Sequence, residues 1–84
     1  MQYVYILKSE KDDELYIGCT GDLKKRLHLH NSKGVPSTRN RVPLKLIYYE
    51  AFLNKEDAFG REQFFKTGWG RNNIKKLLMN YFKS

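Results

Sequence analysis

The chain has 84 residues, of which 40% are hydrophobic and 14% aromatic, and its formal net charge is +7. This length predicts one domain spanning residues 1–84, and the apolar content favours a packed core over disorder. The single cysteine, Cys19, excludes an intramolecular disulfide, and no apolar run approaches the ~18 residues of a membrane span. We therefore expect a cytoplasmic protein that makes no contact with a membrane.

The charges are unevenly distributed along the chain. Four acids crowd Glu10–Glu14, whereas Leu23–Tyr49 contains seven bases and no acid, and five further bases without an acid follow Glu62. A surface of one sign attracts polyanions, above all nucleic acid phosphates. The alternative is a solvated basic surface that serves solubility.

The N-terminal part of the chain predicts an antiparallel hairpin. Gln2–Lys8 alternates and is rich in aromatic and β-branched residues, as is typical of a strand. The polar stretch Ser9–Glu14 predicts a turn, and Leu15–Thr20 a second strand.

The middle of the chain predicts a short helix, a loop and a third strand. Asp22 is a candidate N-cap for a helix over Leu23–Asn31. Ser32–Pro43 contains both prolines and several small polar residues, which indicates a basic loop, and Lys45–Ala51 predicts the third strand.

The C-terminal part predicts two helices. Asn54 and Asp57 resemble a capping box at the start of a helix that ends near Lys66. Gly68–Gly70 interrupts the pattern, and Arg71–Phe82 predicts the last helix. The order β-β-α-β-α-α indicates an α+β fold, a three-stranded antiparallel sheet flanked by helices.

Strand periodicity brings two tyrosines together. If the aliphatic faces of the first two strands coincide, Tyr5 and Tyr16 emerge on the same side of the hairpin. Cross-strand aromatic packing explains such a pair without any function. Cys19 falls on the opposite, aliphatic face with Ile17, which favours a buried thiol over a nucleophile.

The first helix carries an arginine and a histidine four residues apart, Arg26 and His30. His30 lies within the apolar stripe and Arg26 at its edge, while His28 points elsewhere. A histidine in such a stripe is commonly a hydrogen-bonded core residue. An arginine beside it makes a pocket for an anionic group the alternative.

Glu62 falls in the middle of the apolar stripe of its helix. A buried carboxylate needs a cationic partner or a metal ion, because an unpaired buried charge costs several kcal/mol. A salt bridge to Arg26 or Arg61 and a functional role both remain open at this point.

No zinc-ligand spacing, Walker-type glycine loop or protease triad is present. The remaining set of a carboxylate, an arginine, a histidine and phenols suits phosphodiester chemistry. The carboxylate can hold a hard divalent cation, the arginine can balance phosphate charge, and phenol or imidazole can transfer protons.

These residues resemble the GIY-YIG nuclease domain. "YVY" at Tyr3–Tyr5 and "YIG" at Tyr16–Gly18 correspond to the two triplets, and Arg26 and His30 have the family's Arg-x-x-x-His spacing. Glu62 fits the metal-binding glutamate, and "PLKLIYYEAF" and the basic C-terminal helix resemble the small stand-alone bacterial branch. Two departures stand out. Tyr3 replaces the glycine of the first triplet, and the family's downstream asparagine has only Asn72 and Asn73 as candidates.

The resemblance implies an endonuclease that hydrolyses DNA phosphodiester bonds with one divalent cation, Mg²⁺ or Mn²⁺, plausibly in repair or recombination. Glu62 would hold the metal, Arg26 would balance charge on the phosphate, and Tyr5 would be the leading general base. Tyr16 would orient or assist the attacking water, and His30 would support the phosphate and relay protons.

The same resemblance implies DNA as the partner, plausibly structured or branched. A group of exposed bases would follow its backbone, namely Lys24, Lys25, Lys33, Arg39 and Arg41. We expect no separate targeting domain, so the alternative is a partner protein that supplies targeting. A rival reading keeps the fold but not the catalysis and makes the chain a nucleic-acid-binding module.

Overall fold

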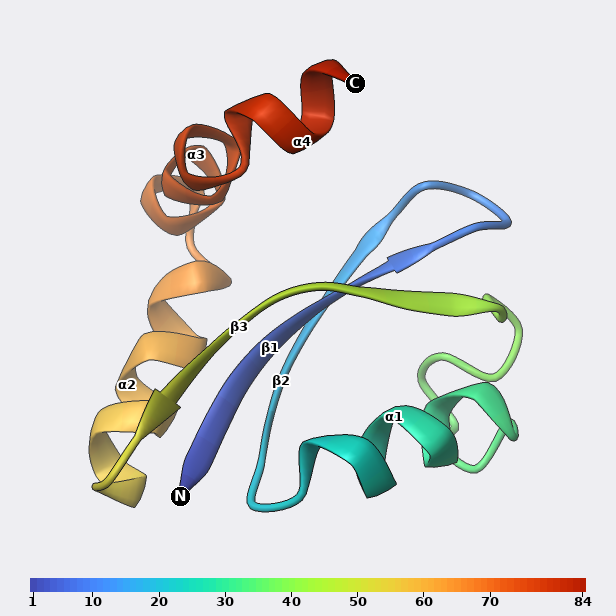
Figure 1. The fold of residues 1–84 in the computed structure, drawn as a ribbon, viewed down its shortest axis with the longest axis horizontal. Coiled ribbons are helices and arrows are strands. Elements are labelled where there is room, and N and C mark those ends of the chain that lie inside the picture. The colour runs from blue at the N-terminus through green and yellow to red at the C-terminus, as the bar shows by residue number, and fades with distance from the viewer.

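The computed structural model describes residues 1–84 and contains three strands and four helices (Figure 1). They are, in order, β1 (Gln2–Ser9), β2 (Leu15–Thr20), α1 (Leu23–Asn31), β3 (Leu44–Phe52), α2 (Lys55–Phe65), α3 (Gly68–Leu77) and α4 (Met79–Lys83). The predicted α+β class and element order are confirmed. The last predicted helix is divided in two.

The sheet is antiparallel throughout and has the strand order β2-β1-β3. β1 is therefore the central strand, and its residues Val4–Leu7 are all buried. Tyr5 faces Gly18 of β2 on one side and Tyr49 of β3 on the other. This register places the residues of both triplet motifs next to one another.

Helices cover both faces of the sheet, with α1 on one side and α2 and α3 on the other (Figure 1). Val4, Ile6 and Ile17 pack with the buried residues of α2 and α3, among them Phe65 and Ile74. Tyr5 and Leu7 point the other way and pack with Leu44 and with partly buried residues that include Leu23 and Leu27 of α1. The alternation of β1 thus supplies two cores, because successive side chains point to opposite faces.

The predicted helix caps are confirmed. The Asp22 side chain accepts a hydrogen bond from the backbone N–H of Lys25 at 3.0 Å, and the Asn54 side chain accepts one from Asp57 at 3.1 Å. Each satisfies a backbone donor that the first turn of a helix leaves without a partner.

The predicted interruption at residues 68–70 is wrong, because these residues form the first turn of α3. Thr67 caps this helix, accepting from the Gly70 N–H at 3.0 Å. A Cβ at Gly70 would lie 1.8 Å from the carbonyl oxygen of Phe64, so glycine here permits close contact with the end of α2. In this position glycine allows tight packing and does not break the helix.

Two further observations concern the surface and the membrane. Cys19 is only half-buried and packs against the core from its edge, so its predicted burial is partial. None of the helices combines the length and apolar character that crossing a bilayer requires.

Candidate active site

The predicted cluster of Tyr5 and His30 is present on the face of the sheet that α1 covers. The Tyr5 hydroxyl and the His30 Nε2 are 3.0 Å apart, and both residues are buried, with 2% and 0% of their surface exposed. Their rings meet edge to face with centroids 5.8 Å apart. His30 is therefore both a hydrogen-bonded core residue and part of the cluster.

Thr38, in the loop between α1 and β3, holds the other nitrogen of the imidazole. His30 Nδ1 and Thr38 Oγ1 are 2.7 Å apart, and the Thr38 hydroxyl is 3.5 Å from the carbonyl oxygen of Val35. If the hydroxyl donates to this carbonyl, Nδ1–H donates to Thr38 and Nε2 accepts from Tyr5. We assign this tautomer because it satisfies every group. Sequence reasoning missed Thr38, because a threonine in a polar loop carries no signal of its own.

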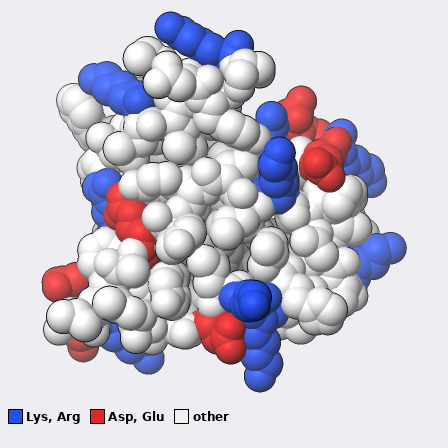
Figure 2. All heavy atoms as spheres, in the orientation of Figure 1, with Lys and Arg blue, Asp and Glu red and all other residues white.

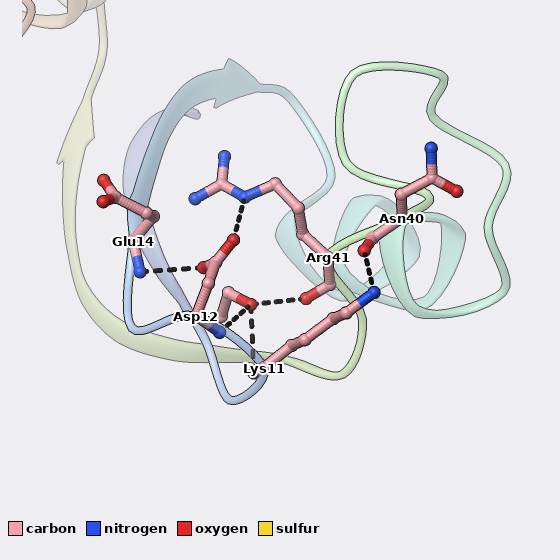
Figure 3. Close-up of polar contacts among 6 residues, drawn as sticks. Lys11, Asp12, Glu14, Asn40 and Arg41 are labelled. Carbon is pink, nitrogen blue, oxygen red and sulfur yellow. Dashed lines mark hydrogen bonds and ion pairs between the residues drawn. The ribbon is translucent and has the colours of Figure 1, made fainter.

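The loop that carries Thr38 is fastened to the turn between β1 and β2. The Ser9 hydroxyl donates to the Arg41 carbonyl at 2.6 Å, and the Lys11 ammonium donates to the Asn40 carbonyl at 3.1 Å. The Arg41 Nε also lies 3.4 Å from an Asp12 carboxylate oxygen (Figure 3). The acidic turn thus helps to fix the loop that orients the histidine.

Tyr16 and Gly18 complete this part of the cluster from β2. The Tyr16 ring lies 5.0 Å from the His30 ring and 6.4 Å from the Tyr5 ring, centroid to centroid. Tyr16 is half-buried, so it is the more accessible phenol. A Cβ at Gly18 would lie 2.4 Å from the Tyr5 hydroxyl oxygen, which means that only glycine leaves room for this phenol.

The electrostatics of the cluster favour the neutral forms of both buried groups. Burial, and secondly the positive charge of Arg26, lowers the pKa of His30, so the imidazole is uncharged at neutral pH. Burial and the neighbouring Tyr16 raise the pKa of Tyr5, while Arg26 lowers it by less. The sequence-based expectation that Tyr5 acts as the leading base conflicts with this environment, because Tyr5 is sealed from solvent and keeps its proton firmly.

Glu62 lies close enough to the cluster to act on it electrostatically. After burial and Tyr16, its charge is a further cause of the raised pKa of Tyr5, and after burial it also raises the pKa of the Cys19 thiol. The Glu62 side chain is only 14% exposed, and its carboxylate lies 3.1 Å from the Lys66 ammonium. The predicted arginine partner is wrong.

Arg61, one of the two arginines expected to pair with Glu62, instead binds Glu50. Its guanidinium donates two hydrogen bonds to that carboxylate, at 2.8 and 3.0 Å. Arg61 also lies over the Phe65 ring, 4.3 Å from its centroid. The sequence of α2 could not reveal this ion pair, because the partner of Arg61 lies on another element, the strand β3.

The single carboxylate of Glu62 suits a hard cation that the protein and the substrate bind together. Glu62 belongs to no group of three or more His, Cys, Asp or Glu side chains. Mg²⁺ keeps several of its waters and is commonly held by one or two carboxylates together with substrate phosphates. The single, largely buried carboxylate of Glu62 fits this pattern if its ion pair with Lys66 opens.

The bases expected to follow a nucleic acid backbone divide into two groups. Four are exposed and take part in no ion pair, namely Lys24, Lys25, Lys33 and Arg39. Arg41 is different. It is half-buried, pairs with Asp12, and its Nε and Nη2 atoms are buried without a hydrogen bond. Arg41 therefore serves the loop structure, contrary to the expectation that it is a free surface cation.

Figure 2 shows one face of the molecule with lysines and arginines around its rim, several of them beside acids, and uncharged atoms across the middle. In the same view of Figure 1, β3 crosses in front of the other two strands. This face does not form a continuous basic surface (Figure 2). If the chain binds a nucleic acid as expected, the bases that contact its phosphates lie on the rim or on other faces.

The sequence matches the family described as the GIY-YIG catalytic domain over residues 1–75. A UPF0213 protein of Clostridium perfringens is 51% identical over 67 residues, which are 79% of this chain and 71% of that protein. A UPF0213 protein of Streptococcus pneumoniae is 48% identical over 65 residues, which are 76% of this chain and 65% of that protein.

A solved structure has a similar fold. The solution NMR structure of a UPF0213 protein from Bacillus halodurans is 36% identical, with a TM-score of 0.57, over 92% of this chain and 85% of that one. The names of these relatives state no activity, so the matches identify a domain and a fold.

Proposed function

The chain belongs to the GIY-YIG catalytic domain family, and on that premise we propose that it is a metal-dependent endonuclease that hydrolyses DNA phosphodiester bonds. The observation that carries the proposal is the contact of Tyr5, Tyr16 and His30, within the electrostatic influence of Arg26 and Glu62. If these aromatic residues served only to pack the core, neither Arg26 nor Glu62 would need to lie near the buried phenol of Tyr5.

Arg26 is the group that would bind the scissile phosphate. It is half-buried and forms no ion pair with any acid of the chain, so its guanidinium is available to an anion. In a partly buried site its charge is screened less than in water, and it would balance the charge that develops on the phosphate in the transition state.

Glu62 would hold the divalent cation, and Mg²⁺ or Mn²⁺ fits its single carboxylate. When bound, the cation would supply Lewis-acid stabilisation of phosphate charge. Lys66 holds the carboxylate in place until then, through the ion pair of 3.1 Å.

The two phenols divide the remaining work according to their exposure. Tyr16 is half-buried, so we assign to it the contact with the attacking water. Tyr5 is buried and donates to His30, so it is a positioning residue that fixes the imidazole together with Thr38. The Tyr16 hydroxyl would orient the water for attack on the phosphate.

The test is nicking of supercoiled DNA with Mg²⁺ or Mn²⁺ by the wild type, by Glu62→Gln and by the matched control Glu56→Gln. Glu56 is exposed in the first turn of the same helix. We expect nicking by the wild type and by the control, and its loss in Glu62→Gln with DNA affinity retained. Equal nicking by all three proteins would refute the role of Glu62.

The rival is a nucleic-acid-binding module without catalysis, and the ion pair of Glu62 with Lys66 favours it, because this pair already neutralises the carboxylate. Under this reading no variant and no metal ion produces nicks, while DNA binding persists. The same experiment therefore separates the two functions.

A further inference from the structure

The only tryptophan of the chain, Trp69, is exposed on the first turn of α3. It is 83% exposed, more than any other aromatic residue in the structure. It belongs to neither core and makes no aromatic contact within the molecule. Its side chain thus contributes little to folding and is free to contact a ligand.

The connection between α2 and α3 presents this tryptophan in a fixed direction. The Thr67 hydroxyl donates to the Phe64 carbonyl at 2.6 Å and accepts from the Gly70 N–H at 3.0 Å. Gly70 lies against Phe64 and Phe65 so closely that no other side chain fits there. Trp69 lies between these anchored residues, so the backbone that carries the indole is already held in place before a ligand binds.

The indole borders a hollow of about 580 Å³ with a basic and amide-rich wall. The residues that line it are Phe64, Trp69, Asn72, Asn73, Lys75 and Lys76. The Asn73 Oδ1 is buried and has no hydrogen-bond partner, and no acid follows Glu62 in the chain. A flat aromatic and two lysines thus line the same hollow, and no acid lies among the lining residues.

We infer that this hollow binds an unpaired nucleotide of a nucleic acid strand. The base stacks on Trp69, and the phosphates on either side of it pair with Lys75 and Lys76. A base within a continuous duplex has no free face to offer the indole. An acidic protein would match the lysines but gains nothing from a flat aromatic beside an amide.

The inference rests on the proposed function and narrows its substrate. Trp69 is seven residues from Glu62, at most about 25 Å even for an extended chain, which corresponds to about seven stacked nucleotides. A substrate that uses both sites therefore has a single-stranded segment close to the phosphodiester that is cut, as a flap, a gap or a branch provides.

The test uses the fluorescence of the protein itself, because Trp69 is the only tryptophan. The wild type is titrated in EDTA with a short oligothymidylate and with a blunt duplex of equal charge. We expect saturable quenching by the single strand and little by the duplex. In anisotropy with a labelled oligothymidylate, Trp69→Ala binds roughly tenfold more weakly, and Trp69→Phe retains most of the affinity. Leu53→Ala, the control, removes a side chain that is 90% exposed and leaves the affinity unchanged.

Three results would overturn the inference. They are binding of the single strand without quenching, equal quenching by the blunt duplex, and unchanged affinity in Trp69→Ala, which would assign the indole to a protein partner. Because EDTA prevents cleavage, the result does not depend on nuclease activity. Quenching without nicking in the experiment with Mg²⁺ or Mn²⁺ would refute the proposed function and leave the nucleotide site standing.

Discussion

The hydrogen bond between Tyr5 and His30 depends on a glycine of the neighbouring strand. Gly18 lies opposite Tyr5 in the register of β1 and β2, and the phenol occupies the space where a Cβ would be. The glycine at the end of the triplet Tyr16–Gly18 therefore matches the family motif and is also required by the space that Tyr5 occupies. A larger residue here forces the phenol to move.

We expect Gly18→Ala to destabilise the protein by about 1–3 kcal/mol, because the new methyl group displaces the Tyr5 ring and weakens its bond to His30. Gly60→Ala is the control. Gly60 lies within α2 with no atom within 4 Å of an added Cβ, so this change stabilises by up to about 1 kcal/mol. Denaturant unfolding of both variants measures the difference, and an unaffected Gly18→Ala would contradict the close contact.

His30 makes the stability of the fold depend on pH. Its pKa is lowered in the folded protein by burial and by Arg26, so between that pKa and about 6.5 the unfolded chain binds more protons. The stabilisation is complete above the unfolded pKa and is lost as the pH falls through the folded one. Each pH unit of this window changes the free energy of unfolding by at most about 1.4 kcal/mol.

We expect the free energy of unfolding to fall between pH 7 and pH 5 in the wild type. The variant His28→Gln is the control and should show the same fall, because His28 is exposed. In His30→Gln the loss over this range should be smaller, although the variant is less stable overall because the imidazole contacts are gone. Parallel pH profiles for all three proteins would show that His30 does not titrate as the structure requires.

At the scale of residues, periodicity predicted parts of the cluster but not its partners. Strand periodicity placed Tyr5 beside Tyr16 and helix periodicity placed His30 in the apolar stripe of α1, but the resemblance to the family was needed to join them in one site. Thr38 could not be predicted, because its position depends on the conformation of a loop. The Lys66 partner of Glu62 was missed although it lies four residues further along the chain, the spacing at which a glutamate and a lysine are neighbours on a helix.

The end of α1 is joined to the start of β3 by one side chain. The Asn31 amide donates to the Leu44 carbonyl at 2.9 Å, and its oxygen accepts from the Leu44 N–H at 2.7 Å. This pair of bonds satisfies the backbone N–H and C=O groups of Leu44, which lies opposite Ser9 of β1 in the register. It also closes the loop that carries Thr38, so the position of His30 depends on it.

We expect Asn31→Ala to lower the free energy of unfolding by about 1–3 kcal/mol, because the backbone groups of Leu44 lose their partners. Asn80→Ala, which removes an exposed amide from α4, should change it by less than about 0.5 kcal/mol. Equal effects in thermal or denaturant unfolding would show that the two bonds are not retained in solution.

At the scale of elements, periodicity and capping residues predicted the three strands and the helices α1 and α2. They predicted α3 and α4 as one helix. The prediction failed at residues 68–70, where two glycines suggested an interruption. Because Gly70 lies against the Phe64 carbonyl, glycine there allows α3 to begin directly after α2. A sequence alone cannot distinguish a glycine that breaks a helix from one that permits close packing.

At the scale of the whole molecule, the net charge is +7, but not every lysine and arginine is free to contact a polyanion. Four ion pairs engage Lys8, Arg41, Arg61 and Lys66 with acids of the chain. Lys24 and Lys25 of α1 and Lys33 and Arg39 of the following loop remain unpaired and exposed. Composition predicted the sign of the surface, but the pairing that removes Arg41 from it required the structure.

We expect Arg39→Ala to reduce the slope of log affinity against log salt for duplex DNA by up to about 0.9, the value for one lost phosphate contact. Arg41→Ala should leave the slope unchanged and should instead destabilise the fold, since it removes the partner of Asp12. Binding titrations over a range of salt concentrations measure both slopes. A smaller slope in Arg41→Ala alone would contradict the assignment.

The most direct test of the catalytic site compares three proteins in single-turnover cleavage of DNA with Mg²⁺ or Mn²⁺, namely the wild type, Tyr16→Phe and Tyr81→Phe. Tyr81 is a half-buried phenol of α4, an element separate from α1 and its face of the sheet (Figure 1). We expect the cleavage rate of Tyr16→Phe to fall about 100-fold or more with its DNA affinity intact, and that of Tyr81→Phe to match the wild type. Equal rates in all three proteins would contradict the claim that the phenol beside His30 takes part in phosphodiester hydrolysis.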